Sequence, residues 1–345
     1  MTRFIQLHLL TSYPPANLNR DDLGQPKTAR FGGRQRIRVS SQSLKRAWRT
    51  SELLQQALSG TIGTRTKLLG VEAHQRLTAG GVEEKKATEW AGLIAAVFGK
   101  LEKNSVRIEQ LVHIAPEEHT AIEALVDRLI SEKRKPTVEE LSALLHEQTA
   151  VDIAMFGRML AASPEHNVEA AVQVAHGIGV HESAIEDDFF TAVDDLKGPG
   201  EDAGAAHIGE AGFAAALFYQ YLCIDRDLLE RNLGGDAALA ARAIRALVDA
   251  AHRVPPNGKQ NSFGSRAFAH YSLAEKGEQQ PRSLSLAFLR PVDGQDYAEE
   301  ATQRLSTLVD DLDQAYGPCA DARYTMDVRS HEGTLAELLD FVAAE

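Results

Sequence analysis

The sequence contains very little cysteine and no long apolar run. Cys223 and Cys319 are the only two cysteines among 345 residues, so we expect no disulfide framework and a reducing cytoplasm as the location. No run of 18 apolar residues occurs, which argues against a membrane span. The first residues, MTRFIQLHLLTSYPP, lack the basic region and cleavage site of a secretory signal. We therefore expect a globular protein with no membrane partner.

Signatures of common enzyme classes are also absent. The sequence has 12 histidines, but none stands in an HExxH arrangement, and two distant cysteines cannot complete a zinc set. It has no GxSxG turn, no Walker loop, and no GxGxxG between a strand and a helix. We therefore expect no catalytic residue, no metal site and no cofactor.

Acidic residues are missing from one stretch of a chain that is otherwise acidic. The protein has 37 lysines and arginines against 49 aspartates and glutamates, a net charge of −12. Residues 23–51, here called the acid-free segment, contain no acid, which leaves 29 bases against 49 acids elsewhere. The eight bases of the acid-free segment are Lys27, Arg30, Arg34, Arg36, Arg38, Lys45, Arg46 and Arg49.

The first half of the acid-free segment predicts a basic strand at 34–40. Period two places Arg34, Arg36 and Arg38 of RQRIRVS on one face, with apolar residues on the core face. Neighbouring positions on one face are about 6.7 Å apart, comparable to successive phosphates of an extended single strand. The arginine fork donates two parallel hydrogen bonds to phosphate. Arginines on an edge strand also deter aggregation, so a structural role is the alternative.

The second half of the segment predicts a basic helix from about Ser41 to Leu58. Ser40 and Ser41 suit the N-cap, where open amides and the positive dipole end attract an anion. Lys45 and Arg49 lie one turn apart and share a face, although a merely solvated face would look the same. Eight bases with no intervening acid favour a polyanion site. Strand and helix together would form a cradle for a sugar-phosphate backbone.

The rest of the sequence predicts a sheet with a helical insertion, an α+β fold. Residues 4–13 alternate between apolar positions and Gln6 and His8, which indicates a half-buried strand. Thr137 and Glu140 form a capping box. Further expected elements are a loop at 14–33, helices in 60–150, an apolar run at 151–160 broken by a glycine, a strand at 212–224, a helix at 236–253, strand-like pieces at 264–274 and 283–290, and a last helix capped by Thr334 with Glu337.

A second charge anomaly lies between Glu182 and Asp202. This stretch has eight acids and the single base Lys197, with several glycines and a proline close together. Such a composition is typical of an exposed loop or a hairpin tip.

Several motifs in order along the chain resemble one known family. The run LNRDDLGQPKTARFGGRQRIRVSSQSLKRAWR (18–49) is similar to the N-terminal signature of the type I-E CRISPR Cascade backbone subunit. Further matching segments are VDIAMFGRM (151–159), FFTAVDDL (189–196), AHIGEAGFAAALFYQY (206–221), NLGG (232–235), GKQ (258–260) and TLAELLDFV (334–342). That family belongs to a superfamily of repeat-associated RNA-binding proteins with RRM-like folds.

The resemblance implies a hand-shaped, non-catalytic subunit. A palm with an RRM-like (ferredoxin-like) sheet would comprise 1–58, 151–182 and 214–345. Residues 59–150 would form helical fingers, and 183–213 a hairpin thumb. Several copies would line up along one CRISPR RNA with other Cascade subunits and present it to a target DNA strand. An acidic thumb cannot hold RNA by charge, so we expect it to act through shape and contact with a neighbouring copy.

The resemblance also implies which residues meet the RNA. Met159, Phe190 and Thr191 would lie where the thumb kinks the strand, although such residues are also common in a core. Basic residues near the C-terminus are few, with Arg290 the one nearby candidate. Together with Arg34, Arg36 and Arg38, the further expected contacts are Arg20, Lys27, Ser40, Gln42, Ser43, Lys45, Arg46, Arg49, Arg158, Lys259 and Gln260.

Two other functions remain open from the sequence. Asp21 and Asp22 are adjacent carboxylates beside a basic strand and could hold a metal that cuts RNA, as in related backbone subunits of type III complexes. Alternatively, either aspartate pairs with a nearby base such as Arg20 or Lys27 and orders the loop. A scaffold that binds only protein would leave the acid-free segment unexplained.

Overall fold

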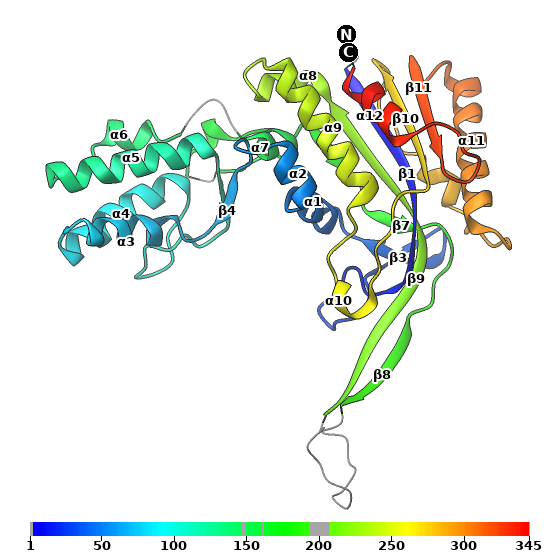
Figure 1. Cartoon of the computed structure of the whole chain (residues 1–345), viewed down its shortest axis with the longest axis horizontal. Coiled ribbons are helices and arrows are strands. Elements are labelled where there is room, and N and C mark those ends of the chain that lie inside the picture. Colours follow the sequence, from blue (N-terminus) through cyan, green and yellow to red (C-terminus); the bar gives the residue numbers. More distant parts are fainter. Residues whose placement is uncertain (1–2, 146–149, 161, 193–206, 345) are drawn as a thin grey trace, which may run out of the picture. The chain divides into compact units, whose positions relative to one another are not determined.

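The computed structural model describes residues 3–145, 150–160, 162–192 and 207–344. They divide into two compact units (Figure 1). The first unit contains Met1–Leu54, Val174–Cys223 and Arg245–Glu345, and the second contains Gln55–Gln173 and Ile224–Ile244. In the part of the chain that the structure describes, no helix is long and apolar enough to cross a membrane.

The first unit is built on a sheet with the strand order β11-β10-β1-β9-β7-β3-β2, and β8 pairs with β9 beyond this path. The β1–β10, β10–β11, β2–β3, β3–β7, β7–β9 and β8–β9 pairs are antiparallel. The β8–β9 hairpin extends away from the rest of the sheet (Figure 1). The strands are β1 (Phe4–Ala16), β2 (Thr28–Phe31), β3 (Arg34–Val39), β7 (Gly177–Gly179), β8 (Glu186–Ala192), β9 (His207–Asp225), β10 (Tyr271–Gly277) and β11 (Ala322–Asp327), with β6 (Val172–Val174) at the division between the units.

Both faces of β1 are buried, so the prediction of a half-buried strand is wrong. Gln6 and His8 are as inaccessible as the apolar residues on the opposite face. The cause is α11 (Tyr297–Tyr316) with the 3₁₀ turn η2 (Ser285–Phe288), which pack against this side of the sheet. The segment 283–290, which the sequence predicted as a strand, supplies part of this cover.

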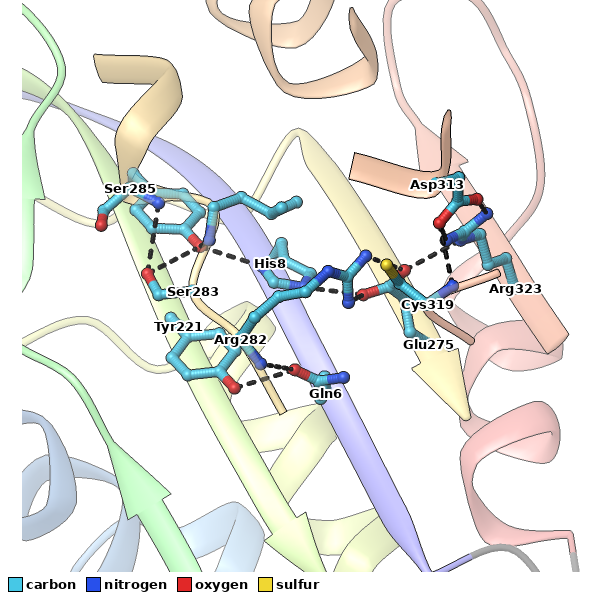
Figure 2. A network of polar contacts seen from close by, with 12 residues as sticks. Gln6, His8, Tyr221, Glu275, Arg282, Ser283, Ser285, Asp313, Cys319 and Arg323 are labelled. Atoms are coloured by element: carbon cyan, nitrogen blue, oxygen red, sulfur yellow. Dashed lines mark hydrogen bonds and ion pairs between the residues drawn. The ribbon is translucent and has the colours of Figure 1, made fainter. Parts of the chain in front are cut away.

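A buried polar network occupies the covered face (Figure 2). The carboxylate of Glu275 accepts hydrogen bonds from His8 Nε2 at 3.2 Å, from both terminal nitrogens of Arg282 at 2.7 and 3.0 Å, and from Arg323 Nε at 2.8 Å. Burial alone raises the pKa of Glu275, but these hydrogen bonds outweigh it and lower the pKa to about 2. The charged carboxylate therefore links β1, β10, β11 and the segment that crosses them.

The acid-free segment folds as a hairpin and the helix α1, and a second helix follows directly after it. Gly32 and Gly33 have φ of 59° and 77°, which suits a tight turn between β2 and β3 inside the predicted loop. The single helix predicted for 41–58 is broken into α1 (Ser41–Arg49) and α2 (Glu52–Ala57). Ser51 causes the break, because its hydroxyl donates to Trp48 O at 2.7 Å and accepts from Leu54 N at 3.2 Å. The other helices of this unit are α10 (Gln260–Phe263) and α12 (Leu335–Ala343), with α9 (Ala237–Arg253) running across the division.

The second unit is mainly helical, as predicted for 60–150. Trp90, Ile94 and Leu125 belong to its own apolar core, and the capping box at Thr137 and Glu140 is present. Residues 151–156 form a helix that ends at Gly157, which has φ of 80°. The elements are β4 (Thr64–Thr66), α3 (Leu69–Ala79), α4 (Glu84–Phe98), β5 (Val112–Ile114), α5 (Pro116–Glu132), α6 (Val138–Ser142), α7 (Val151–Phe156), η1 (Pro164–His166) and α8 (Arg226–Asn232).

Candidate nucleic-acid interface

Neighbouring residues fix the start of α1. Ser40 Oγ accepts from Ser43 N at 3.3 Å, which confirms the predicted N-cap. The amide of Ser40 donates to Asn19 Oδ1 at 2.9 Å, and the amide of Ser41 donates to His176 Nδ1 at 3.2 Å. The first turn of α1 has no acid to offset the positive end of the helix dipole. An anion is therefore favoured at this helix start.

Three bases of the acid-free segment lie around the ring of His176. Arg38 Nη1 is 3.2 Å from His176 Nδ1, and the amide of Arg38 donates to Lys27 O at 2.8 Å. The pKa of His176 is lowered, first by burial and then by the positive charges of Arg38, Lys27 and Lys45. The structure thus brings together three predicted contact residues that the sequence placed on a loop, a strand and a helix.

The outer face of α1 carries the predicted polar residues. Leu44 and Trp48 are buried, as predicted, and Ala47 lies between them on the inner face. Gln42 and Arg46 are exposed, and Ser43, Lys45 and Arg49 are half-buried. The helix therefore presents a polar side, most of it basic, over its whole length.

Arg36 is a correction to the predicted row of three arginines. It is fully buried, and its guanidinium donates to Gly179 O at 3.0 Å and to Phe288 O at 3.1 Å. Arg34 is exposed and lies 3.5 Å from Glu182. The face that Arg36 shares with Arg34 is closed by the segment after Arg282, so Arg36 cannot reach a phosphate in this structure.

A polar cavity of about 380 Å³ adjoins the opposite flank of α1. Gly258 at its rim approaches the chain so closely that a Cβ there would lie 2.2 Å from Leu18 O. The predicted contact residues Arg20, Ser43 and Arg46 meet at this cavity. Its lining comprises Leu18, Asn19, Arg20, Asp21, Ser43, Arg46, Ala47, Asn257 and Gly258.

The GKQ motif serves partly to shape this cavity. Lys259 is half-buried with φ of 46°, in the left-handed region. The side-chain nitrogen Nε2 of Gln260 donates to Pro256 O at 2.9 Å and to Ser265 O at 3.3 Å, and the side-chain oxygen is buried. Gln260 therefore holds the loop, and its contact with RNA stays a prediction because the residue is only half-buried.

Asp21 orders the loop through the backbone and not through a base. Its Oδ1 accepts from the amides of Leu23 and Gln25, both at 2.9 Å. Asp22 is exposed beside it. Among the described residues, no group of three or more histidines, cysteines or acids is placed to hold a metal ion.

The hairpin residues divide between two faces. Adjacent residues of a strand point to opposite sides, so Phe190 faces away from Thr191 and Phe189. Phe190 pairs with Gly209, and a Cβ on that glycine would lie 2.4 Å from the Phe190 ring. Phe190 is 42% exposed, whereas Phe189 on the other face is 67% exposed. Much of the predicted acidic tip, residues 193–202, lies outside the described residues.

Two predicted contacts belong to the second unit and differ from each other. Met159 is 86% exposed, which excludes a core role, and it lines a cavity of about 370 Å³ with Phe98 and Leu111. Arg158 is buried, and its Nη1 lies 2.7 Å from a carboxylate oxygen of Glu118, which is also buried. The prediction that Arg158 contacts RNA is therefore corrected, because this ion pair leaves no exposed guanidinium.

Sequence reasoning missed Asn19, His176 and Phe189. No local pattern marks His176, because its contacts to Arg38 and Ser41 cross more than a hundred residues. Asn19 stands in the motif but carries no charge. Phe189 could have been found, because two adjacent phenylalanines on a strand cannot both face inward.

Comparison with known proteins gives matches over nearly the whole chain. A family model described as CT1975-like protein matches residues 5–341. Comparison with curated protein sequences gives no match. A chain of a solved "CRISPR RNA-guided surveillance complex, pre-nicking" is 29% identical with a TM-score of 0.85, and a chain of a "CRISPR RNA-guided surveillance complex" is 25% identical with a TM-score of 0.75; each match covers 99% of both chains. The chain therefore belongs to the CT1975-like protein family, and the resemblance to CRISPR Cascade backbone subunits is confirmed.

Proposed function

We propose that this protein binds CRISPR RNA as a non-catalytic backbone subunit of a type I-E Cascade surveillance complex. Copies of the chain polymerise along the guide and present it to a target DNA strand, together with other Cascade subunits. The observation that carries the proposal is the acid-free segment, in which seven of the eight bases are exposed or half-buried and three surround the acid-free start of α1. Arginine and lysine at a helix N-terminus suit a sugar-phosphate backbone.

The hand-shaped division belongs to the same proposal. The RRM-like palm comprises 1–58, 151–182 and 214–345, the fingers 59–150 and the thumb 183–213. The described part of β8 supports a thumb that does not grip RNA by charge, because Glu186, Asp187 and Asp188 are all exposed on it. Exposed Met159 supports a wedge that displaces a base.

The nucleic acid carried by the purified full-length protein tests this function. We expect wild type made with a CRISPR transcript to retain RNA that ribonuclease removes and deoxyribonuclease does not. Lys45→Ala with Arg49→Ala should lose most of this RNA. The control, Lys85→Ala with Lys86→Ala, removes two cations from exposed positions of α4 and should retain it. Wild type free of RNA, or equal retention by both double variants, would contradict the proposal.

The metal-dependent nuclease remains the competing function and needs its own measurement. We expect RNA bound to the wild type to stay intact with magnesium or manganese. Asp21→Ala with Asp22→Ala should leave that result unchanged and loosen the loop, because Asp21 holds two backbone amides. RNA cleavage that needs the metal and disappears in the double variant would establish the nuclease instead.

A further inference from the structure

His176 lies where β3 ends and α1 begins. It directly precedes β7, whose Gly177 pairs with Val39, the last residue of β3. This register places the imidazole beside the amide of Ser41. The residue is exposed overall, so one side of the ring meets the protein and another meets solvent.

The two hydrogen bonds at Nδ1 determine the tautomer of this ring. The amide of Ser41 and the guanidinium of Arg38 both lie 3.2 Å from Nδ1, and both groups can only donate. Nδ1 must therefore be the unprotonated nitrogen, and the ring proton is on Nε2. No hydrogen bond or ion pair joins Nε2 to a protein group among the described residues. His176 thus presents an N–H donor beside the bases at the start of α1.

The surrounding charges favour a neutral ring. Arg38 on β3, Lys27 before β2 and Lys45 on α1 are the charged groups that act on it, and no acid is among them. An imidazolium would be repelled by all three and would break both hydrogen bonds at Nδ1. A neutral ring adds a directed hydrogen bond to the cluster without adding to its repulsion.

We propose that His176 donates its Nε2–H to an oxygen of the RNA sugar-phosphate backbone, while its Nδ1 holds Arg38 and the first turn of α1 in place. The inference rests on the proposed RNA-binding function and adds a neutral contact to it. The three cations favour a phosphate oxygen over a ribose hydroxyl as the acceptor. Because the contact carries no charge, it contributes affinity without releasing a counterion.

Three substitutions separate the two ends of the ring. His176→Asn can place an amide oxygen near Nδ1, so it keeps the anchor for Ser41 and Arg38 but has no donor at the Nε2 position. His176→Gln can place an amide N–H near Nε2, so it keeps the donor and loses the anchor. His176→Ala removes both. Thermal unfolding of each full-length variant identifies any that fails to fold, and the remaining variants still decide the question.

Binding of a labelled single-stranded RNA, and of DNA of the same sequence, is measured as a function of salt. We expect His176→Asn and His176→Ala to weaken RNA binding about tenfold, as for loss of one hydrogen bond to a charged group, with the log–log salt slope unchanged. His176→Gln should bind more tightly than either. If the variants lose affinity for DNA as much as for RNA, the acceptor is a phosphate oxygen. If they lose affinity for RNA alone, the acceptor is the ribose 2′-hydroxyl.

Two results would overturn the inference. If His176→Asn restores full affinity while His176→Gln does not, the ring only positions Arg38 and α1. If the log–log salt slope of His176→Ala becomes shallower, as expected for removal of a cation such as Lys45, the contact made by His176 is charged. A wild type that binds no RNA would instead refute the proposed function, so the two failures are distinguishable.

Discussion

Arg34 and Arg36 stand two residues apart on one strand, but Arg34 is exposed and Arg36 is buried. The Arg34 side chain is 61% exposed and lies 3.5 Å from Glu182, also at the surface. Arg36 is fully buried and satisfies the carbonyl oxygens of Gly179 and Phe288. One therefore contributes positive potential at the surface, and the other joins β3 to β7 and to the segment that covers the sheet.

This difference predicts that the same substitution destabilises the protein at Arg36 much more than at Arg34. Arg36→Ala should lower the free energy of unfolding by about 3 kcal/mol, because it strands two buried carbonyls and leaves a cavity. Arg34→Ala should change it by no more than about 0.5 kcal/mol, since exposed ion pairs contribute little. Urea unfolding of both variants measures this. Equal losses of stability would show that the described burial of Arg36 is incorrect.

His8 and Glu275 both contribute to the pH dependence of stability. The charged carboxylate of Glu275 can only accept, so the neutral ring of His8 bears its proton on Nε2, and its Nδ1 accepts from Tyr219 Oη at 2.9 Å. Tyr219 Oη in turn accepts from Leu284 N at 2.8 Å. Burial lowers the pKa of His8 by more than the hydrogen bond and charge of Glu275 raise it. The ring is therefore neutral in the folded protein.

Both groups predict loss of stability in acid. As the pH falls below about 6.5, His8 becomes protonated in the unfolded chain before it does in the folded protein. The contribution of His8 to the free energy of unfolding is therefore lost from about pH 6.5 downward. The contribution of Glu275 is present above its ordinary pKa and is lost as the pH falls toward about 2. Thermal unfolding at several pH values should show this decline, and His8→Gln should reduce the part between about pH 7 and about pH 5. A variant with the same decline as wild type would exclude His8 as its source.

The positions of single residues could be predicted where they depend on the neighbouring sequence. Ser40, Leu44 and Trp48 followed from helix capping and spacing, which are properties of the neighbouring sequence. The burial of Arg36 depends on residue 288, and the position of His176 depends on strand pairing far along the chain. Period two correctly assigned Arg36 to the face of Arg34, but it could not show that this face was covered.

The β8–β9 hairpin is the element whose role depends least on charge. Phe190 lies over Gly209, where the ring covers backbone that the glycine leaves bare, and Phe189 and Thr191 face the other way. Three exposed acids precede them on β8. Apolar rings on an acidic strand can displace a base from its stack, but they cannot attract phosphate.

Phe190 of the hairpin and exposed Met159 are therefore predicted to affect the geometry of the bound RNA and not its affinity. Met159→Ala with Phe190→Ala should blur the periodic reactivity of assembled RNA toward base-modifying reagents, while assembly persists. Stacking and wedging contacts are worth about 1 to 3 kcal/mol per base, which is enough to set a register over several copies. Tyr316→Ala, which removes a ring that is 82% exposed on α11, is the matched control and should keep the pattern sharp. Wild-type RNA without periodicity, or a double variant with a sharp one, would refute the wedge.

Elements with a strong local signal were predicted, and those defined by distant contacts were not. The strand at 212–224, the helix at 236–253 and the last capped helix are present as β9, α9 and α12. Residues 151–156, which the sequence showed only as part of a short apolar run, form a helix, and 285–288 form a 3₁₀ turn where a strand-like piece was expected. Short apolar runs cannot be assigned by periodicity alone, because buried strands and buried helix segments look alike.

The whole molecule separates its charges along the chain. The net charge of −12 combines an acid-free segment of eight bases with a much more acidic remainder. Such a distribution limits phosphate binding to one surface, because screening confines the effect of charge to about 10 Å. The phosphates of the RNA should therefore follow the surface formed by β3, α1 and the loop before them, and the acidic hairpin should meet bases and not phosphates.

The salt dependence of RNA affinity tests this account most directly. Binding of single-stranded RNA should weaken linearly on a log–log plot, with a slope of about −0.7 for each phosphate contacted. Lys45→Ala with Arg49→Ala should make the slope shallower by about 1.4 and weaken all RNA sequences alike. Lys85→Ala with Lys86→Ala should leave the slope unchanged. A Lys45 and Arg49 double variant with the wild-type slope would contradict the claim that α1 contacts the RNA backbone.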